Sequence, residues 1–419
     1  MKSIGSLYME LKQHYPQSSL YSDLGFILNV ESCKHIELPY VNDLKSLVAN
    51  YEKADVPDIC CGIMTYNEER CIYRCLNSIV GEFDEIILLD SFSTDNTVKI
   101  VKENFPEVKI FFEPWINDFS HHRNQIIKHA STQWVYFIDA DNWYDTENKG
   151  KAKRIAKLIE FLNIKCLISP LIHEHNGNIQ IDNRKMFPLK YDIKFYGKVH
   201  EEPLFPDYTV PLNIDVNIKV HHDGYDATIV DQRKKIERNL NLIKEMIEQE
   251  PQNPKWFYFY GRELYEYKED IQVVKNILLK AVTLYKSSSY KRYYFETILL
   301  FCDVLLQTGD FKMLYEHIML LEKEFPECID TDYFKASMIF VDIRNKTKNL
   351  IDSLEKSIGN SQKYSVMNPK LDHIRYLISN MYLFLLDIDS VKRTYNQIES
   401  DDFKNAFKNN VDEIKKIDL

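Results

Sequence analysis

The chain has 419 residues, of which 45% are hydrophobic and 13% aromatic, and its formal net charge is −10. This length predicts two or three folded domains, and the negative charge argues against a protein that binds nucleic acid. With only 11 glycines, the composition suits a chain rich in helix better than a loop-rich β protein.

Nothing in the sequence predicts a targeting or membrane segment. The opening stretch, MKSIGSLYMELKQHY, carries charges throughout and lacks the apolar core of a signal peptide. No stretch approaches the roughly 18 uninterrupted apolar residues of a membrane-spanning helix. A cytoplasmic protein without a membrane partner is therefore expected.

The eight cysteines contain no CxxC pair, and we predict that they are reduced, buried thiols. Cys71 and Cys75 lie four residues apart, which places them on one face of a helix. Half of a metal site is the alternative interpretation of this pair.

Residues 1–56 are predicted to form helices that lack a core of their own. From there the pattern alternates between short buried apolar runs and amphipathic helices, which predicts βαβ units and a parallel sheet. The four predicted strands are Ile59–Thr65, Glu85–Asp90, Lys109–Glu113 and Trp134–Asp139. The helices between them are expected to open at Asn67, to follow the polar turn Ser91–Thr97, and to span His121–Ala130.

The second half of the chain changes character twice. Near residue 165, the runs CLISPLI, KMFPL and VNIKVHH predict short strands of a mixed sheet. After Gly224 the pattern is almost purely helical, and stretches such as PKWFYFYGREL and TILLFCDVLLQTGDFKMLYEHIM resemble tetratricopeptide repeats of about 34 residues. A plain helical bundle is the alternative. The expected domains are 1–56, 57–232 and 233–419.

Acidic and polar residues follow the predicted strands. Asp139 and Asp141 come directly after the buried run WVYFI, the first strand runs into TYNEE, and the second ends in Asp90 and SFSTDN. Ligands of an open parallel sheet bind beyond the carboxyl ends of its strands, and carboxylates suit Mg²⁺ or Mn²⁺ bridged to phosphates. No glycine-rich phosphate loop follows any strand, which disfavours dinucleotide enzymes and P-loop NTPases.

Six segments, YNEE, LLDSFSTDNT, WINDFSHHRN, FIDADN, FYGKVHEEP and HHDGY, follow one another in the order that resembles family 2 glycosyltransferases. The resemblance covers about residues 57–240. It implies an α/β GT-A domain (Rossmann-like, with a mainly parallel sheet), followed by an all-α tetratricopeptide-like domain. With its N-terminal helices and helical tail, the layout is most similar to the cysteine S-glycosyltransferases of glycocin bacteriocin biosynthesis, the sublancin type.

This resemblance implies a function in some detail. A hexose, with glucose expected, would pass with inversion and metal dependence from a UDP-sugar to a cysteine thiol of a precursor peptide. The enzyme would be a homodimer joined through its helical regions. Which hexose is used, and whether the ion is Mg²⁺ or Mn²⁺, is not encoded in any motif.

The resemblance also implies roles for individual residues. The expected nucleotide-sugar contacts are Thr65, Tyr66, Asn67, Glu68, Asp90, Ser91, Ser93, Arg123, Asn124, Asp139 and Ala140. The expected metal ligands are Asp141, His222 and Asp139, with His221 as the second choice for the histidine. The expected catalytic residues are Glu201, as the base, and His200 beside it, with Glu202 as the alternative carboxylate.

One segment departs from the family's pattern. Many relatives carry Arg-x-Phe-Arg before the Gly-x-x-His-Glu segment, whereas here Pro188 stands where the second arginine often lies. Arg184 or Lys185 is expected to serve in its place.

Two other functions are compatible with parts of the sequence. The same chemistry could act on a hydroxyl of a cell-surface polysaccharide or lipid-linked sugar, although no membrane-binding stretch is apparent. Alternatively, the helical tail could serve a non-catalytic scaffold. The joint presence of Asp90, Asp139, Asp141 and His222 argues against the scaffold, because an inactive domain has no need of all four.

Overall fold

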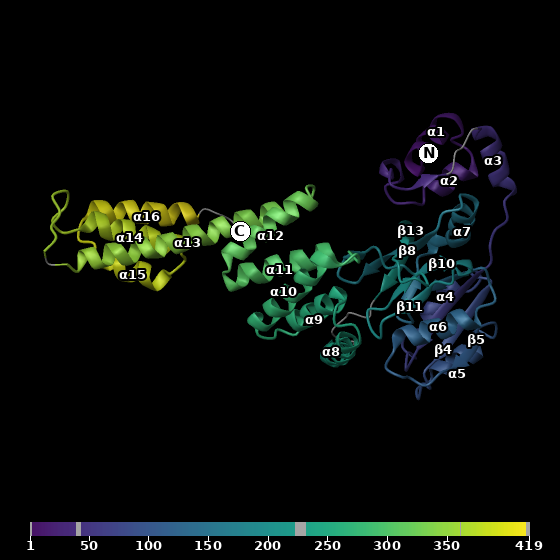
Figure 1. Ribbon diagram of the computed structural model, residues 1–419. Coiled ribbons are helices and arrows are strands. Elements are labelled where there is room, and N and C mark those ends of the chain that lie inside the picture. The colour runs from purple at the N-terminus through teal and green to yellow at the C-terminus, as the bar shows by residue number, and fades with distance from the viewer. Residues whose placement is uncertain (1, 39–42, 223–231, 361, 416–419) are drawn as a thin grey trace. The chain divides into compact units, whose positions relative to one another are not determined.

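The structure, a computed structural model, describes residues 2–38, 43–222, 232–360 and 362–415. It comprises two compact units, residues 1–294 and 295–419 (Figure 1). Three residues of the HHDGY segment lie outside the described residues: Asp223, Gly224 and Tyr225.

A large sheet of nine strands forms the centre of the first unit, with the order β5-β4-β3-β6-β10-β8-β13-β7 and β9 paired to β8. The strands are β3 (Ile59–Thr65), β4 (Glu85–Asp90), β5 (Lys109–Phe112), β6 (Trp134–Phe137), β7 (Asn142–Tyr144), β8 (Cys166–Glu174), β9 (Ile179–Gln180), β10 (Met186–Pro188) and β13 (Leu212–His222). The first four strands in this order pair in parallel. Because β10 pairs antiparallel with β6 and β8, the sheet is mixed beyond that point. Both the parallel half and the mixed half that the sequence predicts are confirmed.

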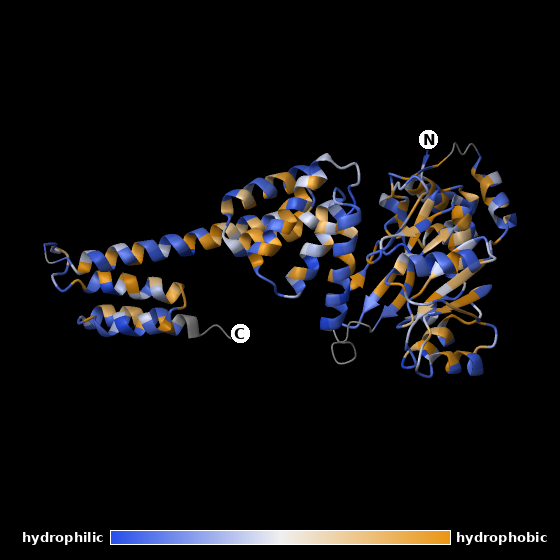
Figure 2. Ribbon diagram, turned by 60° about the horizontal axis from the view of Figure 1, so that its bottom comes forward, coloured by the Kyte–Doolittle hydropathy of each residue, from blue (hydrophilic) through white to orange (hydrophobic). Residues whose placement is uncertain are grey.

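Helices cover both faces of this sheet. Neighbouring residues along a strand point to opposite faces, so Cys60 and Cys61 belong to different apolar clusters. One cluster includes Ile126 of helix α6 (Phe119–His129). The other packs against α4 (Ile72–Ile79), α5 (Thr97–Asn104) and α7 (Lys151–Phe161). Hydrophobic residues accordingly lie among the strands and helices of this unit in Figure 2.

The N-terminal segment has no core of its own, as predicted. Its elements are β1 (Lys2–Ser3), α1 (Ile4–His14), α2 (Ser19–Leu24), β2 (Glu37–Leu38) and α3 (Leu44–Lys53). Ile4, Leu7 and Leu11 are fully buried in the same cluster as the sheet. Buried Asp23 accepts hydrogen bonds from the Tyr51 hydroxyl and from Arg154 Nε, the latter at 2.6 Å, which fastens the segment to α7.

Several boundaries differ from the expected ones: β5 ends at Phe112 rather than at Glu113, β6 ends at Phe137 rather than at Asp139, and two helices begin elsewhere. Helix α4 begins at Ile72 rather than at Asn67, because Asn67 adopts a left-handed conformation with φ of 57°. Helix α6 begins earlier, at Phe119, because the Asp118 carboxylate accepts a hydrogen bond from the His121 amide at 2.9 Å and so caps the helix.

Helices dominate the rest of the chain. A two-stranded sheet of β11 (Lys194–Tyr196) and β12 (Glu202–Leu204) precedes β13, and α8 (Gln232–Gln249), α9 (Pro254–Glu266) and α10 (Ile271–Ser287) complete the first unit. The expected domain limits remain a prediction. The chain divides into its two compact units after Tyr294.

The second unit is wholly helical in its described part. Its helices are α11 (Tyr294–Thr308), which begins at the boundary, α12 (Phe311–Glu324), α13 (Asp330–Ile358), α14 (Asp372–Phe384), α15 (Ile388–Asn396) and α16 (Asp401–Lys415). Helix α13 is a single helix of 29 residues, longer than a helix of a tetratricopeptide unit. The repeat interpretation therefore remains a prediction.

No helix within the described ranges is both long and apolar enough to cross a membrane. All eight cysteines are free thiols, and seven of them are buried, as predicted.

Candidate active site

Thr65 and Asp90 lie side by side at the carboxyl ends of β3 and β4. The Thr65 hydroxyl donates to Asp90 Oδ2 at 3.0 Å, and Ser93 donates to both carboxylate oxygens, from its amide at 2.8 Å and its hydroxyl at 2.6 Å. Asp90 is fully buried. The structure thus brings together three of the residues predicted to receive the nucleotide and holds the carboxylate rigidly.

The loops that follow β3 and β4 are joined through Asn67. Its amide donates to Ser93 Oγ at 2.8 Å, and its side-chain oxygen accepts from the Thr94 amide at 2.8 Å. Next to this turn, the Tyr66 side chain is 58% exposed, so its ring is open to stack on a base. Phe92, which is 55% exposed, offers a second such ring and was not predicted from the sequence.

Arg123 joins two of the predicted carboxylates. Its Nε donates to Glu201 Oε1 at 2.6 Å, and its Nη2 lies 3.1 Å from Asp139 Oδ1. Lys185 Nζ lies 2.8 Å from the other Asp139 oxygen. Burial raises the pKa of Asp139, but the positive charges of Lys185 and Arg123 lower it by more, so this pKa lies far below its usual range. Two cations and two carboxylates therefore meet beyond the end of β6.

The residues around Asp141 have the chemistry of a divalent-cation site. His222 Nε2 lies 3.1 Å from Asp141 Oδ2, and the other Asp141 oxygen is buried without a hydrogen-bond partner among the described residues. Burial lowers the pKa of His222, but its contacts with Asp141 and Glu174 outweigh this effect and raise the pKa above its ordinary value. A carboxylate oxygen and an imidazole nitrogen that face one another fit Mg²⁺ or Mn²⁺.

The protein alone does not complete such a site. Within the described ranges, no three His, Cys, Asp or Glu side chains are grouped as a metal centre. An ion bound by Asp141 and His222 would take its other ligands from substrate oxygens, as is usual where metals bridge phosphates. The alternative that Cys71 and Cys75 form half of a site is not supported, because their sulfurs contact Glu68 and the Asp139 carbonyl.

The segment that carries Glu201 is fixed by helix α9. Gly197 has φ of 103°, and a Cβ there would lie 2.6 Å from the Trp256 ring, so only glycine fits. Glu202 Oε1 accepts from buried Lys255 Nζ at 2.7 Å and from the Tyr290 hydroxyl at 2.7 Å. Glu202 is thus a structural residue that faces away from Arg123, which favours Glu201 over its neighbour as the base.

Arg292 completes the charge balance of this buried group. Its Nη1 donates to Glu202 Oε2 at 2.6 Å. Burial raises the pKa of Glu202, but the positive charges of Lys255 and Arg292 outweigh this effect and lower the pKa to about 2. Glu202 is therefore ionised at neutral pH, and its charge is fully paired.

Two predicted site residues, His200 and Asn124, use their polar atoms in contacts within the protein. The His200 ring stacks on Phe259, with ring centroids 3.9 Å apart, and its Nε2 lies 3.0 Å from Glu263 Oε1. Burial lowers the pKa of His200 to about 4. Asn124 donates to and accepts from the Phe195 backbone, both at 2.9 Å. Direct roles for these two residues remain predictions.

The remaining predicted residues lie at the same edge. The Ser91 amide donates to the Thr65 carbonyl at 2.9 Å, and Ala140 is buried between the two aspartates. Glu68 turns toward α4, where Cys71 Sγ lies 3.1 Å from its Oε2, and burial raises the pKa of Glu68. His221 points to the other face of the sheet, where it lies 2.9 Å from Asp145.

Three groups were missed or left open from the sequence. Lys185, one of two candidates for the absent arginine, is the residue that reaches Asp139, whereas Arg184 pairs with Asp182 at 2.7 Å. Glu174 was missed, although its position at the end of the run CLISPLIHE was a signal of the same kind as Asp139. Lys255 was missed because its helix looked like part of a separate domain.

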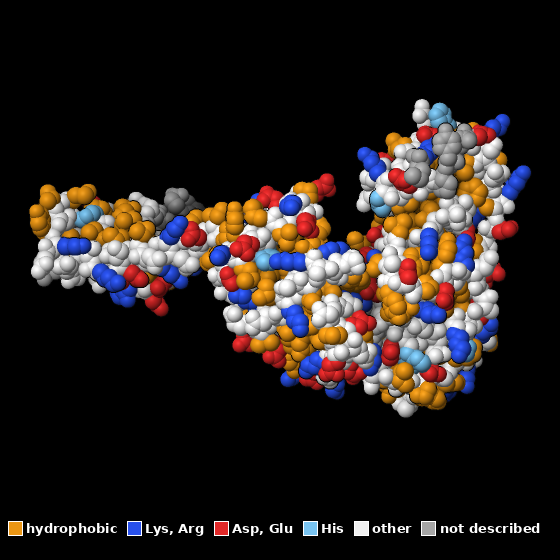
Figure 3. Space-filling model, viewed as in Figure 1, with side chains coloured by type: hydrophobic (Ala, Val, Ile, Leu, Met, Phe, Trp, Pro, Cys, Tyr) orange, Lys and Arg blue, Asp and Glu red, His pale blue; other side chains and the backbone are white. Residues whose placement is uncertain are grey.

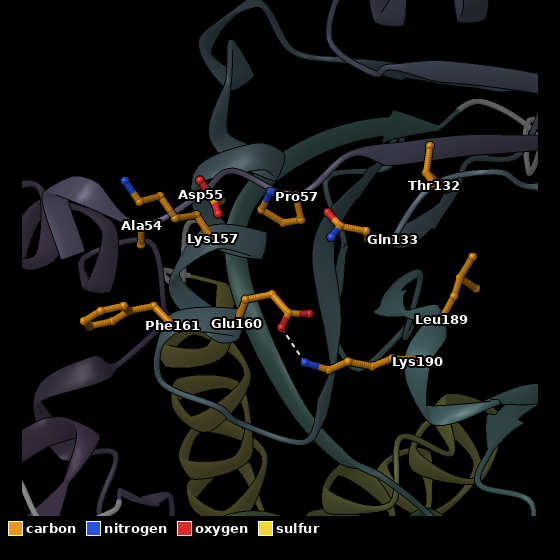
Figure 4. A pocket seen from close by; sticks show the side chains of 10 residues that line it. All are labelled: Ala54, Asp55, Pro57, Thr132, Gln133, Lys157, Glu160, Phe161, Leu189 and Lys190. Atoms are coloured by element: carbon orange, nitrogen blue, oxygen red, sulfur yellow. Dashed lines mark hydrogen bonds and ion pairs between the residues drawn. The ribbon is translucent and has the colours of Figure 1, made fainter. Parts of the chain in front are cut away.

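A pocket of about 460 Å³ lies elsewhere, at the amino ends of β3 and β6. Figure 4 shows its lining, which includes Pro57, Gln133 and the ion pair of Glu160 with Lys190. It contains none of the predicted site residues. Because ligands of such sheets bind at the carboxyl ends of the strands, it is not the candidate active site.

Comparison with known proteins finds similar glycosyltransferases. The family model described as Glycosyl transferase family 2 matches residues 60–195. The chain is 42% identical over 406 residues to the SPbeta prophage-derived glycosyltransferase SunS of Bacillus subtilis (strain 168), and equally to glycosyltransferase SunS of Bacillus phage SPbeta. Each alignment covers 97% of this chain and 95% of the relative.

Among solved structures, S. aureus TarS 1–349 in complex with UDP-GlcNAc is 15% identical, with a TM-score of 0.36. That alignment covers 67% of this chain and 88% of TarS 1–349.

Replacing Lys255 by Met tests the buried charge group. Removal of one partner from a buried ion pair lowers the free energy of unfolding by about 3–5 kcal/mol, and we expect the lower part of this range because Arg292 still pairs with Glu202. Lys219→Met, which removes an exposed pair with Glu147, is the matched control and should change little. Denaturant unfolding of the full chain, followed by tryptophan fluorescence, measures both.

The difference in stability between the wild type and Lys255→Met has an expected pH dependence. Because folding lowers the pKa of Glu202 from an ordinary value of 4.5 to about 2, its stabilisation is complete above the higher value and is lost as pH falls toward the lower one. The difference between wild type and Lys255→Met should shrink over that interval. A difference that stays constant from neutral pH to about 2 would contradict the assignment.

Proposed function

Because this chain belongs to glycosyltransferase family 2, as its similarity to SunS over almost the whole of both chains shows, we propose that it is a peptide S-glycosyltransferase. It transfers a hexose, glucose in the first instance, from a UDP-sugar to a cysteine thiol of a bacteriocin precursor peptide. The full-length similarity to SunS supports this acceptor. It is consistent with the resemblance to the sublancin type that the sequence motifs indicated. The observation that carries the chemistry is the convergence of Asp139, Arg123, Lys185 and Glu201 beyond one strand.

The donor fits the edge formed by β3, β4 and β6. The rigid group of Thr65, Asp90 and Ser93 offers polar atoms for a uracil, and the exposed ring of Tyr66 offers a surface for stacking. The cations Arg123 and Lys185 lie where a diphosphate would leave, and fixed positive charges at that place stabilise the charge that develops as the bond breaks.

A divalent ion is part of this proposal. Asp141 and His222 would hold Mg²⁺ or Mn²⁺, which would neutralise diphosphate charge. The unpartnered buried oxygen of Asp141 supports this role, because a buried carboxylate oxygen without a partner is unfavourable.

The reaction is a single displacement with inversion. The thiol sulfur attacks the anomeric carbon from the face opposite the UDP group; a C–S bond forms as the C–O bond to UDP breaks, and UDP takes the bonding electrons. The carboxylate of Glu201 accepts the thiol proton. Arg123 holds one oxygen of Glu201 at 2.6 Å and so orients the base beside the donor.

Intact mass tests the proposed function. The protein is incubated with Mn²⁺, a panel of UDP-hexoses and two helical-hairpin peptides that differ only in a loop cysteine or serine. We expect the cysteine peptide to gain one hexose, resistant to base-promoted elimination, and Asp141→Asn to abolish the gain. If only the serine peptide gains a hexose, the acceptor is a hydroxyl and not a thiol. If neither peptide gains a hexose with any donor, the proposal is contradicted.

Glu201→Gln separates the two kinds of acceptor. A thiol with a pKa near 8.5 loses its proton far more readily than a hydroxyl, so it depends less on a base. We expect any transfer to serine to fall by about 10²–10⁴-fold and transfer to cysteine to fall by less. Single-turnover rates measure both, and equal losses would show that Glu201 does not act as the base.

We also propose that the enzyme is a homodimer joined through its second unit. Apolar side chains gather on the surface of that unit in Figure 3, and on α13 the exposed ones include Tyr333, Ile339, Phe340 and Ile343. Contiguous exposed apolar surface of this kind is typical of interaction sites.

Phe340→Glu tests this arrangement. A buried unpaired charge is unfavourable at an interface, so the variant should sediment as a monomer at concentrations at which the wild type is a dimer. Val273→Glu, at an exposed apolar position of α10 in the first unit, is the control. A dimer unaffected by the change at Phe340 would exclude this face of α13 as the interface.

A further inference from the structure

Strand β13 lies between β8 and β7, and this placement sets the surroundings of its last residue. His222 is in register with Glu174 of β8 on one side and with Asn142 of β7 on the other. Asn142 directly follows Asp141 in the chain. The two ring nitrogens of His222 can therefore reach two different acidic residues, one at the end of each neighbouring strand.

Both contacts are formed. His222 Nδ1 lies 2.7 Å from Glu174 Oε2, and Nε2 lies 3.1 Å from Asp141 Oδ2. The Glu174 side chain is only 6% exposed and that of His222 is 11% exposed. Two carboxylates thus bind one imidazole in a place largely screened from water, where such contacts are strong.

Glu174 is itself held in place. Its second oxygen, Oε1, accepts a hydrogen bond from the side-chain amide of Gln180 on β9, and its backbone amide donates to the Asn178 carbonyl at 2.8 Å. The carboxylate therefore lies beside the turn of the β8–β9 hairpin, and both of its oxygens accept hydrogen bonds or contact a histidine nitrogen. A side chain bound in this way has a fixed orientation and can impose one on its partner.

A histidine that binds a metal through one nitrogen usually donates its other N–H group to a carboxylate. That partner selects the tautomer, orients the ring and makes the metal-binding nitrogen more basic. In this chain Nδ1 faces Glu174, which leaves Nε2 on the side of Asp141, whose Oδ1 is buried without a hydrogen-bond partner among the described residues.

We propose that Glu174 is the positioning residue of the cation site: it holds His222 so that Nε2 and the Asp141 carboxylate bind one divalent ion together. This inference rests on the metal dependence in the proposed function and adds a residue to it. Gln180 supports Glu174 from the opposite side.

The neighbouring histidine provides an internal control. His221 Nε2 lies 2.9 Å from Asp145 Oδ2, and its ring stacks on Trp143 with centroids 5.3 Å apart. Adjacent residues of a strand face opposite sides, so this second histidine–carboxylate pair has the same chemistry but does not reach Asp141. Replacement of Asp145 by Asn should therefore leave the cation site intact.

Mn²⁺ binding to the full-length protein in the presence of UDP tests the inference, with free Mn²⁺ measured by electron paramagnetic resonance. Glu174→Gln should raise the dissociation constant for Mn²⁺ by about 10–100-fold, whereas Asp145→Asn should leave it unchanged. Gln180→Leu, at an exposed position of the hairpin, should weaken Mn²⁺ binding in the same direction but by less than Glu174→Gln. If Glu174→Gln does not fold, the Mn²⁺ affinity of Gln180→Leu tests the inference in its place.

The outcomes are distinguishable. If the wild type binds Mn²⁺ and Glu174→Gln binds it equally well, or if Glu174→Gln and Asp145→Asn weaken binding to the same extent, Glu174 has no specific role and the proposed function stands. If the Glu174 variant does not fold, unchanged Mn²⁺ affinity in Gln180→Leu overturns the inference. If the wild type binds no Mn²⁺ with UDP, both the metal dependence and the inference are wrong.

Discussion

The arrangement of the site depends on one buried cation. The Arg123 guanidinium lies over the rings of Phe137 and Phe195, 5.3 Å from each centroid, and its side chain is 8% exposed. A charge in such a place is unfavourable unless it is paired, and the pairing is supplied by Asp139 at the end of β6 and by Glu201. One side chain of α6 therefore fixes the distance between Asp139 and the proposed base, Glu201.

The second constraint lies on the other side of the segment that carries Glu201. Glu201 turns toward Arg123, while Glu202 turns toward Lys255, Tyr290 and Arg292. Since both glutamates are held by charges from different elements, the segment between Gly197 and β12 has little freedom. Helix α9 is thus part of the framework of the candidate active site. The first helices of the helical region therefore belong to the same compact unit as the sheet.

Much of the sheet and part of the site could be predicted from the sequence because they follow local patterns. Buried runs alternate with amphipathic helices, which indicates parallel strands, and polar residues at strand ends such as Asp90, Asp139 and Asp141 must meet at one edge. Local patterns failed where backbone conformation intervened, as at Asn67. Nor do local patterns record the contacts of a polar side chain with a remote backbone or ring, such as those of Asn124 and His200.

The sequence by itself determined the order of the elements, the edge at which the acidic residues gather, and the family to which the chain belongs. Only the tertiary structure decided the partners: Lys185 with Asp139, 46 residues apart; Glu174 with His222, 48 apart; and Lys255 with Glu202, 53 apart. The physical reason is that periodicity reports which face of an element is buried. Which charges meet across elements is set by strand order and helix packing, and no local pattern records these.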